Sequence, residues 1–158
     1  MDACVFQPIG VIRTPFSEQR ETPIQPAYAQ GVRGTLEVDP AYREALADLD
    51  GFERIWVIYR FDRAKAFQPL VVPYRDAVVR GLFATRAPSR PNPIGLSVLR
   101  LLGIDGTVVH VTDVDVLDGT PLLDIKPYVP AFDAFPDAAA GWLDAAGTGR
   151  TRADRRFE

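Results

Sequence analysis

The chain has 158 residues and a mass of 17.4 kDa, the size of one domain. Apolar residues make up 47% and charged residues 25%, which is typical of a soluble globular protein and excludes disorder of the whole chain. A net charge of -3 excludes whole-molecule attraction to nucleic acid, so only a local basic patch could bind it. With one cysteine (Cys4) and one histidine (His110), the chain can build neither an internal disulfide nor a Cys/His zinc site.

The N-terminus has no basic segment followed by an apolar one, so we expect no signal peptide. No apolar run approaches the roughly 18 residues that a membrane span needs. We therefore expect a soluble, cytoplasmic protein without a membrane partner.

The first part of the chain predicts strands around a long loop. Residues Val5 to Ile12 are apolar and β-branched but contain Pro8, which predicts an interrupted or edge strand. Residues 13–30 contain three prolines and show no hydrophobic periodicity, which predicts a long loop. Loops of that length are often functional. The alternation over Arg33 to Val38 predicts a second strand.

A helix and a central strand follow. Asp39 can cap a helix that begins at Pro40, and Gly51 stands where it would stop. Residues 54–61 read RIWVIYRF, which predicts a strand with apolar side chains on both faces, as in the middle of a sheet. One of those faces carries Ile55, Val57, Tyr59 and Phe61.

The second half predicts a hairpin. Strands over Ile94 to Ile104 and Thr107 to Val116 are joined by Asp105-Gly106, a strong turn signal. A further strand over Pro121 to Ile125 and a short helix around Trp142 follow. The arginine-rich tail from Thr148 to Glu158 is weakly patterned, and we expect it to be mobile.

Short strands that do not alternate with helices predict a mainly β fold. We expect a small closed β-barrel in one domain, with one or two short helices, outside the Rossmann class. The predicted barrel domain spans residues 1–136, and residues 137–158 form a C-terminal extension with a short helix and a mobile basic tail.

The segment from Phe83 to Ser97 is the first with unusual chemistry. Its prolines hold the backbone extended, which fixes Arg86 and Arg90 on a rigid piece of chain. Rigid arginines bind carboxylates and phosphates well, and Gly95 permits a close ligand approach. A proline-stiffened crossover with solvated arginines explains the pattern equally well.

The second such segment, from Asp115 to Tyr128, reads DVLDGTPLLDIKPY. A polar turn at Asp118 to Thr120 and an ion pair between Asp124 and Lys126 account for most of it. The sequence contains neither a G-x-G-x-x-G motif nor a G-x-x-x-x-G-K-[ST] phosphate loop. His110, flanked by valines, is interpreted as a structural or half-exposed strand residue.

These two segments resemble the TsaA-like family, which includes the TrmO tRNA methyltransferases. The resemblance is carried by RPNPIGLS at 90–97 and LDGTPLLDIKPY at 117–128. It is also carried, in the same order, by IGVIRTPF at 9–16, TPIQP at 22–26 and LDGFERIWVIYRF at 49–61. The resemblance spans roughly residues 5–132.

The resemblance implies a β-barrel-like fold and S-adenosylmethionine as cofactor, bound at a homodimer interface. It also implies methylation of N6 of threonylcarbamoyl-adenosine next to the anticodon of tRNA. Longer family members carry a further C-terminal domain that has no counterpart in the region of resemblance, which leaves the mode of tRNA binding open.

The family's cofactor-contacting positions carry over to four parts of this chain: the proline loop, the end of the central strand, the rigid arginine segment and the LDGT turn. They are Gln25, Pro26, Ala27, Asp62, Arg63, Arg86, Leu96, Leu117, Asp118, Gly119 and Thr120. Many members have Ser in place of Ala87 and His in place of Asp62, so this chain lacks a hydroxyl beside Arg86 and carries a carboxylate instead of an imidazole.

Methylation of an exocyclic amine needs a group that takes its proton. By residue type alone the candidates are Asp118, Asp124 and Tyr128. Lys126, with Arg13, Arg86 and Arg90, forms the predicted basic patch for tRNA phosphates. No metal is expected.

Other function classes stay open on the residues alone. One is an S-adenosylmethionine-binding module without catalysis, and another is a methyltransferase for a different, small acceptor. A plain nucleic-acid-binding barrel is disfavoured because basic and aromatic residues are not interleaved.

Overall fold

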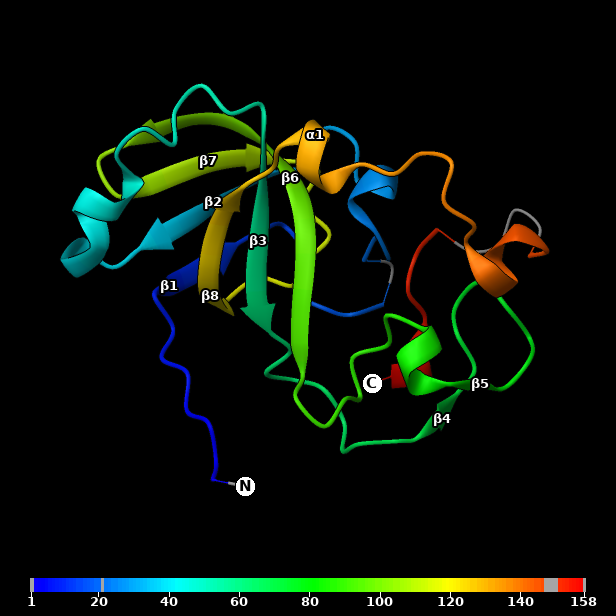
Figure 1. The fold of residues 1–158 in the computed structure, drawn as a ribbon. Coiled ribbons are helices and arrows are strands. Elements are labelled where there is room, and N and C mark those ends of the chain that lie inside the picture. The colour runs from blue at the N-terminus through cyan, green and yellow to red at the C-terminus, as the bar shows by residue number, and fades with distance from the viewer. Residues whose placement is uncertain (1, 21, 147–150, 158) are drawn as a thin grey trace.

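The structure is a computed structural model that describes residues 2–20, 22–146 and 151–157. Six antiparallel strands close into a barrel in the order β1-β2-β7-β6-β3-β8 (Figure 1). The strands are β1 (Gly10–Arg13), β2 (Arg33–Val38), β3 (Arg54–Arg60), β6 (Ile94–Asp105), β7 (Val108–Thr112) and β8 (Thr120–Pro127). The predicted closed, mainly β fold is therefore confirmed.

The barrel interior is filled by the alternate side chains of these strands. The strand β3 pairs with β6 on one side and β8 on the other, which confirms its predicted central place. Its inward residues Ile55, Val57 and Tyr59 are buried, as the period-2 pattern predicts. The rest of this core consists of Ile12, Leu36, Val38, Leu99, Val109, Val111, Val114, Val116 and Leu122.

A smaller layer lies beside the barrel (Figure 1). It contains the two-stranded sheet of β4 (Leu70–Val71) and β5 (Arg80–Gly81), which the sequence analysis did not predict. Four buried residues form its core: Val71, Leu82, Ala87 and Phe157. The short helices of the chain are η1 (Pro26–Tyr28), η2 (Pro40–Leu46), η3 (Leu82–Ala84), α1 (Pro130–Asp133), η4 (Gly141–Asp144) and η5 (Arg155–Phe157).

The described part of the tail, residues 151–157, is packed and does not extend into solvent. The Ile24 N–H donates to the Thr151 carbonyl, and the Ala153 N–H donates to the Thr22 carbonyl. The Phe157 ring packs edge-on against Tyr74 at 5.2 Å. The mobility of the tail stays a prediction, and the burial of Phe157 is a tertiary contact that the local sequence does not reveal. Residues 147–150 and 158 lie outside the described residues, and the domain boundary at 136/137 stays a prediction.

Strand β1 is shorter than predicted. Pairing begins directly after Pro8, where the Ile9 N–H donates to the Leu122 carbonyl, and the regular strand starts at Gly10. Val5 and Phe6 are exposed. A proline has no N–H to give to a ladder, so the segment before it does not join the barrel.

The predicted helix after Asp39 and the predicted strand to Val116 are also cut short. Asp39 does cap its helix, accepting a hydrogen bond from the Ala41 N–H, but the turn is a 3₁₀-helix. The helix ends at Leu46, because Ala47 takes an extended backbone conformation (φ -57°, ψ 141°); Asp48 then takes a left-handed one (φ 61°) before Gly51. Asp113 does the same at φ 69° and ends β7 at Thr112.

Among residues 2–20, 22–146 and 151–157, no helix is long and apolar enough to cross a lipid bilayer.

Gly95 is tightly enclosed, and its substitution tests the packing at this end of the barrel. A methyl group at Gly95 would come 2.3 Å from Cε2 of Tyr59 and 2.9 Å from Cζ of Phe61. We expect Gly95→Ala to lower the free energy of unfolding by about 1–3 kcal/mol in a denaturant titration. The matched control is Gly81→Ala, where the added methyl meets nothing within 4 Å. Equal stability of the two variants would contradict the packing described here.

Candidate functional site

The register of the barrel brings several predicted residues to one mouth. Tyr59, near the end of β3, pairs with Gly95 at the start of β6 and with Leu122 at the start of β8. Ile12 of β1 pairs with Thr120. The end of β3, the start of β6 and the turn before β8 therefore lie together.

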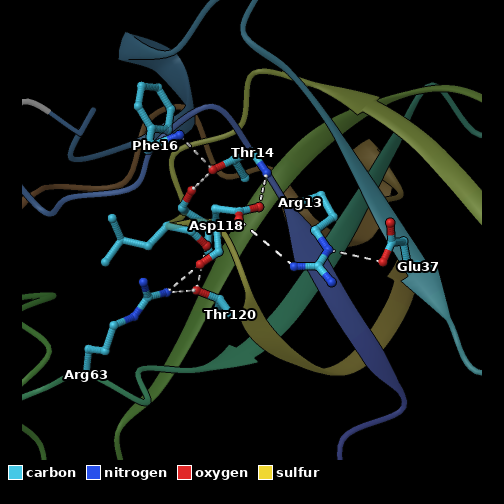
Figure 2. Close-up of polar contacts among 9 residues, drawn as sticks. Arg13, Thr14, Phe16, Glu37, Arg63, Asp118 and Thr120 are labelled. Carbon is cyan, nitrogen blue, oxygen red and sulfur yellow. Dashed lines mark hydrogen bonds and ion pairs between the residues drawn. The ribbon is translucent and has the colours of Figure 1, made fainter.

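The turn before β8 is held by hydrogen bonds to residues 14–16 (Figure 2). The Thr14 N–H donates to Oδ1 of Asp118 at 3.0 Å, and the Thr14 hydroxyl donates to the Val116 carbonyl at 2.8 Å. The Asp118 N–H donates to the Phe16 carbonyl at 2.7 Å. One carboxylate oxygen of Asp118 is thus engaged in fixing the loop, and its predicted role as a proton acceptor stays a prediction.

Arg63 links the end of β3 to the same turn (Figure 2). Its Nη2 donates to the Asp118 carbonyl at 2.8 Å and to Oγ1 of Thr120 at 3.2 Å. Its Nε lies 3.5 Å from Oδ1 of Asp62. The 62–63 and 117–120 parts of the predicted set are therefore in direct contact.

Gln25 and Arg86 form the second pair of the predicted set. Nη1 of Arg86 donates a hydrogen bond to Oε1 of Gln25 across 61 positions of sequence. Pro26 and Ala27 lie in η1, which directly follows Gln25, and the tail residues 151–153 hold the backbone just before it. Arg86 is exposed, so its guanidinium is accessible to a ligand.

Hydrogen bonds within the segment that carries Arg86 hold its backbone in place. Nη1 of Arg90 donates to the carbonyls of Thr85 at 2.9 Å and Ala87 at 3.2 Å, so Arg90 holds its own loop together. Ala87 is buried in the apolar cluster with Phe157. A hydroxyl at position 87 would need a hydrogen-bond partner there, which gives a physical reason for alanine. The predicted tRNA contact of Arg90 stays a prediction.

The inside of the mouth holds a polar chain that the sequence analysis missed. Oγ of Ser97 lies 2.7 Å from Oδ1 of Asp115 and 3.1 Å from the hydroxyl of Tyr59. Tyr59 and Ser97 are buried, and Asp115 is partly exposed. The alternation of side chains along the strands could have predicted them. Ser97 pairs with the inward residue Val57, so its hydroxyl points into the core.

The burial of this hydrogen-bonded group of side chains changes the pKa values of Asp115 and Tyr59. Loss of water raises the pKa of Asp115 to about 7, although the Ser97 hydrogen bond and the nearby Arg86 charge oppose that rise. Burial also raises the pKa of Tyr59 far above its ordinary value, and the negative charge of Asp115 raises it further. Arg86 therefore acts electrostatically on the interior chain as well as contacting Gln25.

Two predicted residues, Asp124 and Lys126, lie farther along β8, and a third, Tyr128, directly follows that strand. Ile55 pairs with Pro127 at the opposite end of the β3–β8 ladder from Tyr59. Nζ of Lys126 pairs with Asp124 at 2.7 Å, as predicted from their spacing. The Tyr128 ring packs against Trp56 at 5.8 Å. The structure does not bring Asp124 or Tyr128 to Asp118, and their catalytic roles stay predictions.

Arg13 lies on the side of the barrel. Its Nε pairs with Glu37 at 3.1 Å, and its Nη1 lies 4.0 Å from Oδ2 of Asp118 (Figure 2). It also lines an open groove along β1, β2, β7 and the second half of β6, together with Arg33 and His110. Among the residues that the structure describes, no group of three or more His, Cys, Asp or Glu side chains is placed to hold a metal ion.

Comparisons with known proteins identify the family to which this chain belongs. Residues 11–134 match the family described as the tRNA-methyltransferase O N-terminal domain. A probable S-adenosyl-L-methionine-binding protein of Pyrococcus abyssi is 51% identical over 139 residues, covering 88% of this chain and 76% of the relative. The tRNA (adenine(37)-N6)-methyltransferase of Escherichia coli K12 is 35% identical, covering 92% of this chain and 66% of the relative.

A solved structure shares the fold. The crystal structure of TrmO from Pseudomonas aeruginosa superimposes with a TM-score of 0.75 at 42% identity, covering 89% of this chain. This chain spans 62% of that protein's length, which is less than two thirds. On the family match over residues 11–134, the chain belongs to the tRNA-methyltransferase O N-terminal domain family.

Proposed function

We propose that this chain binds S-adenosylmethionine at the mouth of its barrel and transfers the methyl group to N6 of threonylcarbamoyl-adenosine next to the anticodon of tRNA. The names of the Pyrococcus abyssi and Escherichia coli relatives support the cofactor and the adenine N6 acceptor, respectively. The threonylcarbamoyl group rests on the resemblance of the sequence motifs to the TrmO family.

The residues at the mouth fit the chemistry of this cofactor. The exposed guanidinium of Arg86 suits its carboxylate, and the carboxylates of Asp62 and Asp118 suit its ammonium. The half-exposed Leu96 and the loop at Pro26 supply apolar surface for its adenine. When bound, the cofactor supplies a methyl group on a positively charged sulfur.

The observation that carries the proposal is the hydrogen bond between Gln25 and Arg86. It joins two segments, 61 positions apart in sequence, that the family resemblance implies are parts of one cofactor site. Arg63 joins the other two predicted segments through Asp118 and Thr120. These residues orient the ligand, and aligning the reactants accounts for much of the rate of a displacement reaction.

Transfer RNA is the proposed macromolecular partner. The open groove that contains Arg13 and Arg33 offers two guanidinium groups for phosphate contacts, with Asp105 also in its lining. Lys126 is exposed on β8 beside Asp124. Phosphate contacts release counterions, so we propose that tRNA affinity falls steeply as salt concentration rises.

We further propose a cytoplasmic homodimer. Symmetric dimers are the commonest oligomers, and the layer beside the barrel exposes Phe67, Leu70 and Phe83. Light scattering would then detect a particle of twice the chain's 17.4 kDa. A particle of the chain's own mass at micromolar concentration would contradict a site shared between two copies.

A binding module without catalysis is the second candidate function. The description of the Pyrococcus abyssi relative, which names binding only, favours it. Such a protein would bind S-adenosylmethionine and methylate nothing.

Calorimetric titration with S-adenosylmethionine tests the cofactor site. We expect saturable binding, and we expect Arg86→Ala to raise Kd by roughly 10- to 100-fold, because a charge-assisted hydrogen bond contributes about 1.5–3 kcal/mol. The matched control is Arg100→Ala, which removes an equal charge from an exposed pair with Glu53 and should leave Kd unchanged. Equal affinity of the Arg86→Ala and unchanged proteins would place the cofactor elsewhere.

Methyl transfer tests the acceptor. Purified protein is incubated with S-adenosylmethionine and tRNA with or without the threonylcarbamoyl group, and the nucleosides are analysed by mass spectrometry. We expect one added methyl group only on the threonylcarbamoyl-adenosine. Cofactor binding without methylation of either tRNA would favour the binding module, and methylation of unmodified adenosine would contradict the proposed acceptor.

A further inference from the structure

Three polar side chains from three parts of the chain meet inside the barrel mouth: Tyr59 of β3, Ser97 of β6 and Asp115 of the segment after β7. Tyr59 is 4% exposed and Ser97 is 2% exposed. Buried polar groups lose their hydration, and this hydrogen-bonded chain replaces some of it.

The direction of the hydrogen bonds follows from the count of protons. The Asp115 carboxylate has no proton to donate, so the Ser97 hydroxyl donates to its Oδ1. With that single proton used, Oγ of Ser97 accepts the hydrogen bond from the Tyr59 hydroxyl. Both donors therefore point toward Asp115, and the chain ends on a group that takes up a proton.

Asp115 is also the outermost of the three hydrogen-bonded side chains. It is partly exposed, whereas its two partners are buried. It lies two positions before Leu117 in the predicted cofactor turn, and Ser97 adjoins Leu96, another predicted cofactor residue. Arg86 is near enough to influence the charge on Asp115. The carboxylate thus opens toward the residues that are proposed to hold the cofactor.

We propose that Asp115 is the base that accepts the proton of the acceptor amine during methyl transfer. This inference rests on the proposed function. The amine nitrogen forms a bond to the methyl carbon, the carbon–sulfur bond breaks, and its electron pair stays on sulfur. The nitrogen's proton passes to the Asp115 carboxylate, which then releases it to water.

Ser97 and Tyr59 are positioning residues in this proposal. They orient the carboxylate, and Ser97 stabilises its charged form directly. The groups that face Asp115 are the Ser97 hydroxyl, the Tyr59 hydroxyl beyond it and the Arg86 guanidinium. A base whose pKa lies near the working pH is the most effective one, and burial raises the pKa of Asp115 to about 7.

The first test compares Asp115→Asn with Asp50→Asn. Asp50 is exposed in the loop before β3, at the opposite end of that strand from Tyr59, so this control should behave as the unchanged protein. We expect Asp115→Asn to lower kcat for tRNA methylation by about 100- to 10,000-fold while retaining calorimetric binding of S-adenosylmethionine. Unchanged kcat in Asp115→Asn would overturn the inference alone. Absence of transfer by the unchanged protein would overturn the proposed function and this inference with it.

The second test is a pH profile of Ser97→Ala. Asp115 must be ionised to accept a proton, so the rate of the unchanged protein should rise with pH, with the midpoint of the rise near the pKa of about 7. The Ser97 hydrogen bond lowers the pKa of Asp115. Its removal should therefore raise that pKa and move the rise in rate to higher pH. An unmoved rise in Ser97→Ala would contradict the proposed base.

The third test measures thermal stability as a function of pH and does not require methyl transfer. The folded-state pKa of Asp115 lies above its ordinary value of 3.8, so between about pH 4 and pH 7 the folded protein binds more protons than the unfolded chain. The contribution of Asp115 to stability therefore falls as pH rises through that window. We expect Asp115→Asn to gain thermal stability relative to the unchanged protein between pH 4 and pH 7, and a constant difference would contradict the burial argued for this carboxylate.

Discussion

The double pairing of β8, with β1 on one side and β3 on the other, is the constraint on which the rest of the structure depends. It closes the sheet and leaves no open edge among its six strands. It also fixes the turn before β8 beside the end of β3, where Arg63 binds that turn. The pairing that closes the barrel therefore also places two segments of the candidate site beside each other.

The mouth of the barrel combines two kinds of polar contact with different roles. Contacts such as those of Asp118 with Thr14 and of Arg90 with Thr85 tie side chains to backbone groups and hold loops in place. The chain from Tyr59 through Ser97 to Asp115 joins side chains only. It ends on a carboxylate whose ionised form is disfavoured by burial, which is a common property of groups that transfer protons.

Much of the barrel could be predicted from the sequence, because alternation and Asp-Gly turns are local signals. The strands over residues 33–38, 54–60 and 94–105 appear where the pattern places them. Two failures lie in the backbone: the helix ends where Ala47 becomes extended, and β7 ends before the left-handed Asp113. No local pattern requires either conformation. The burial of Phe157 and the meeting of Ser97 with Asp115 depend on tertiary packing, so residue type alone could not predict them.

The central claim is that the cofactor lies at the mouth defined by Gln25, Arg86 and the 117–120 turn. Amide chemical shifts of the isotope-labelled protein, followed during titration with S-adenosylmethionine, test it most directly. The account predicts saturable shifts for Gln25, Arg86 and Gly119, with that of Lys126, which pairs with Trp56 farther along β8, unchanged. Shifts confined to the far end of β8, or to the groove beside Arg33, would contradict it.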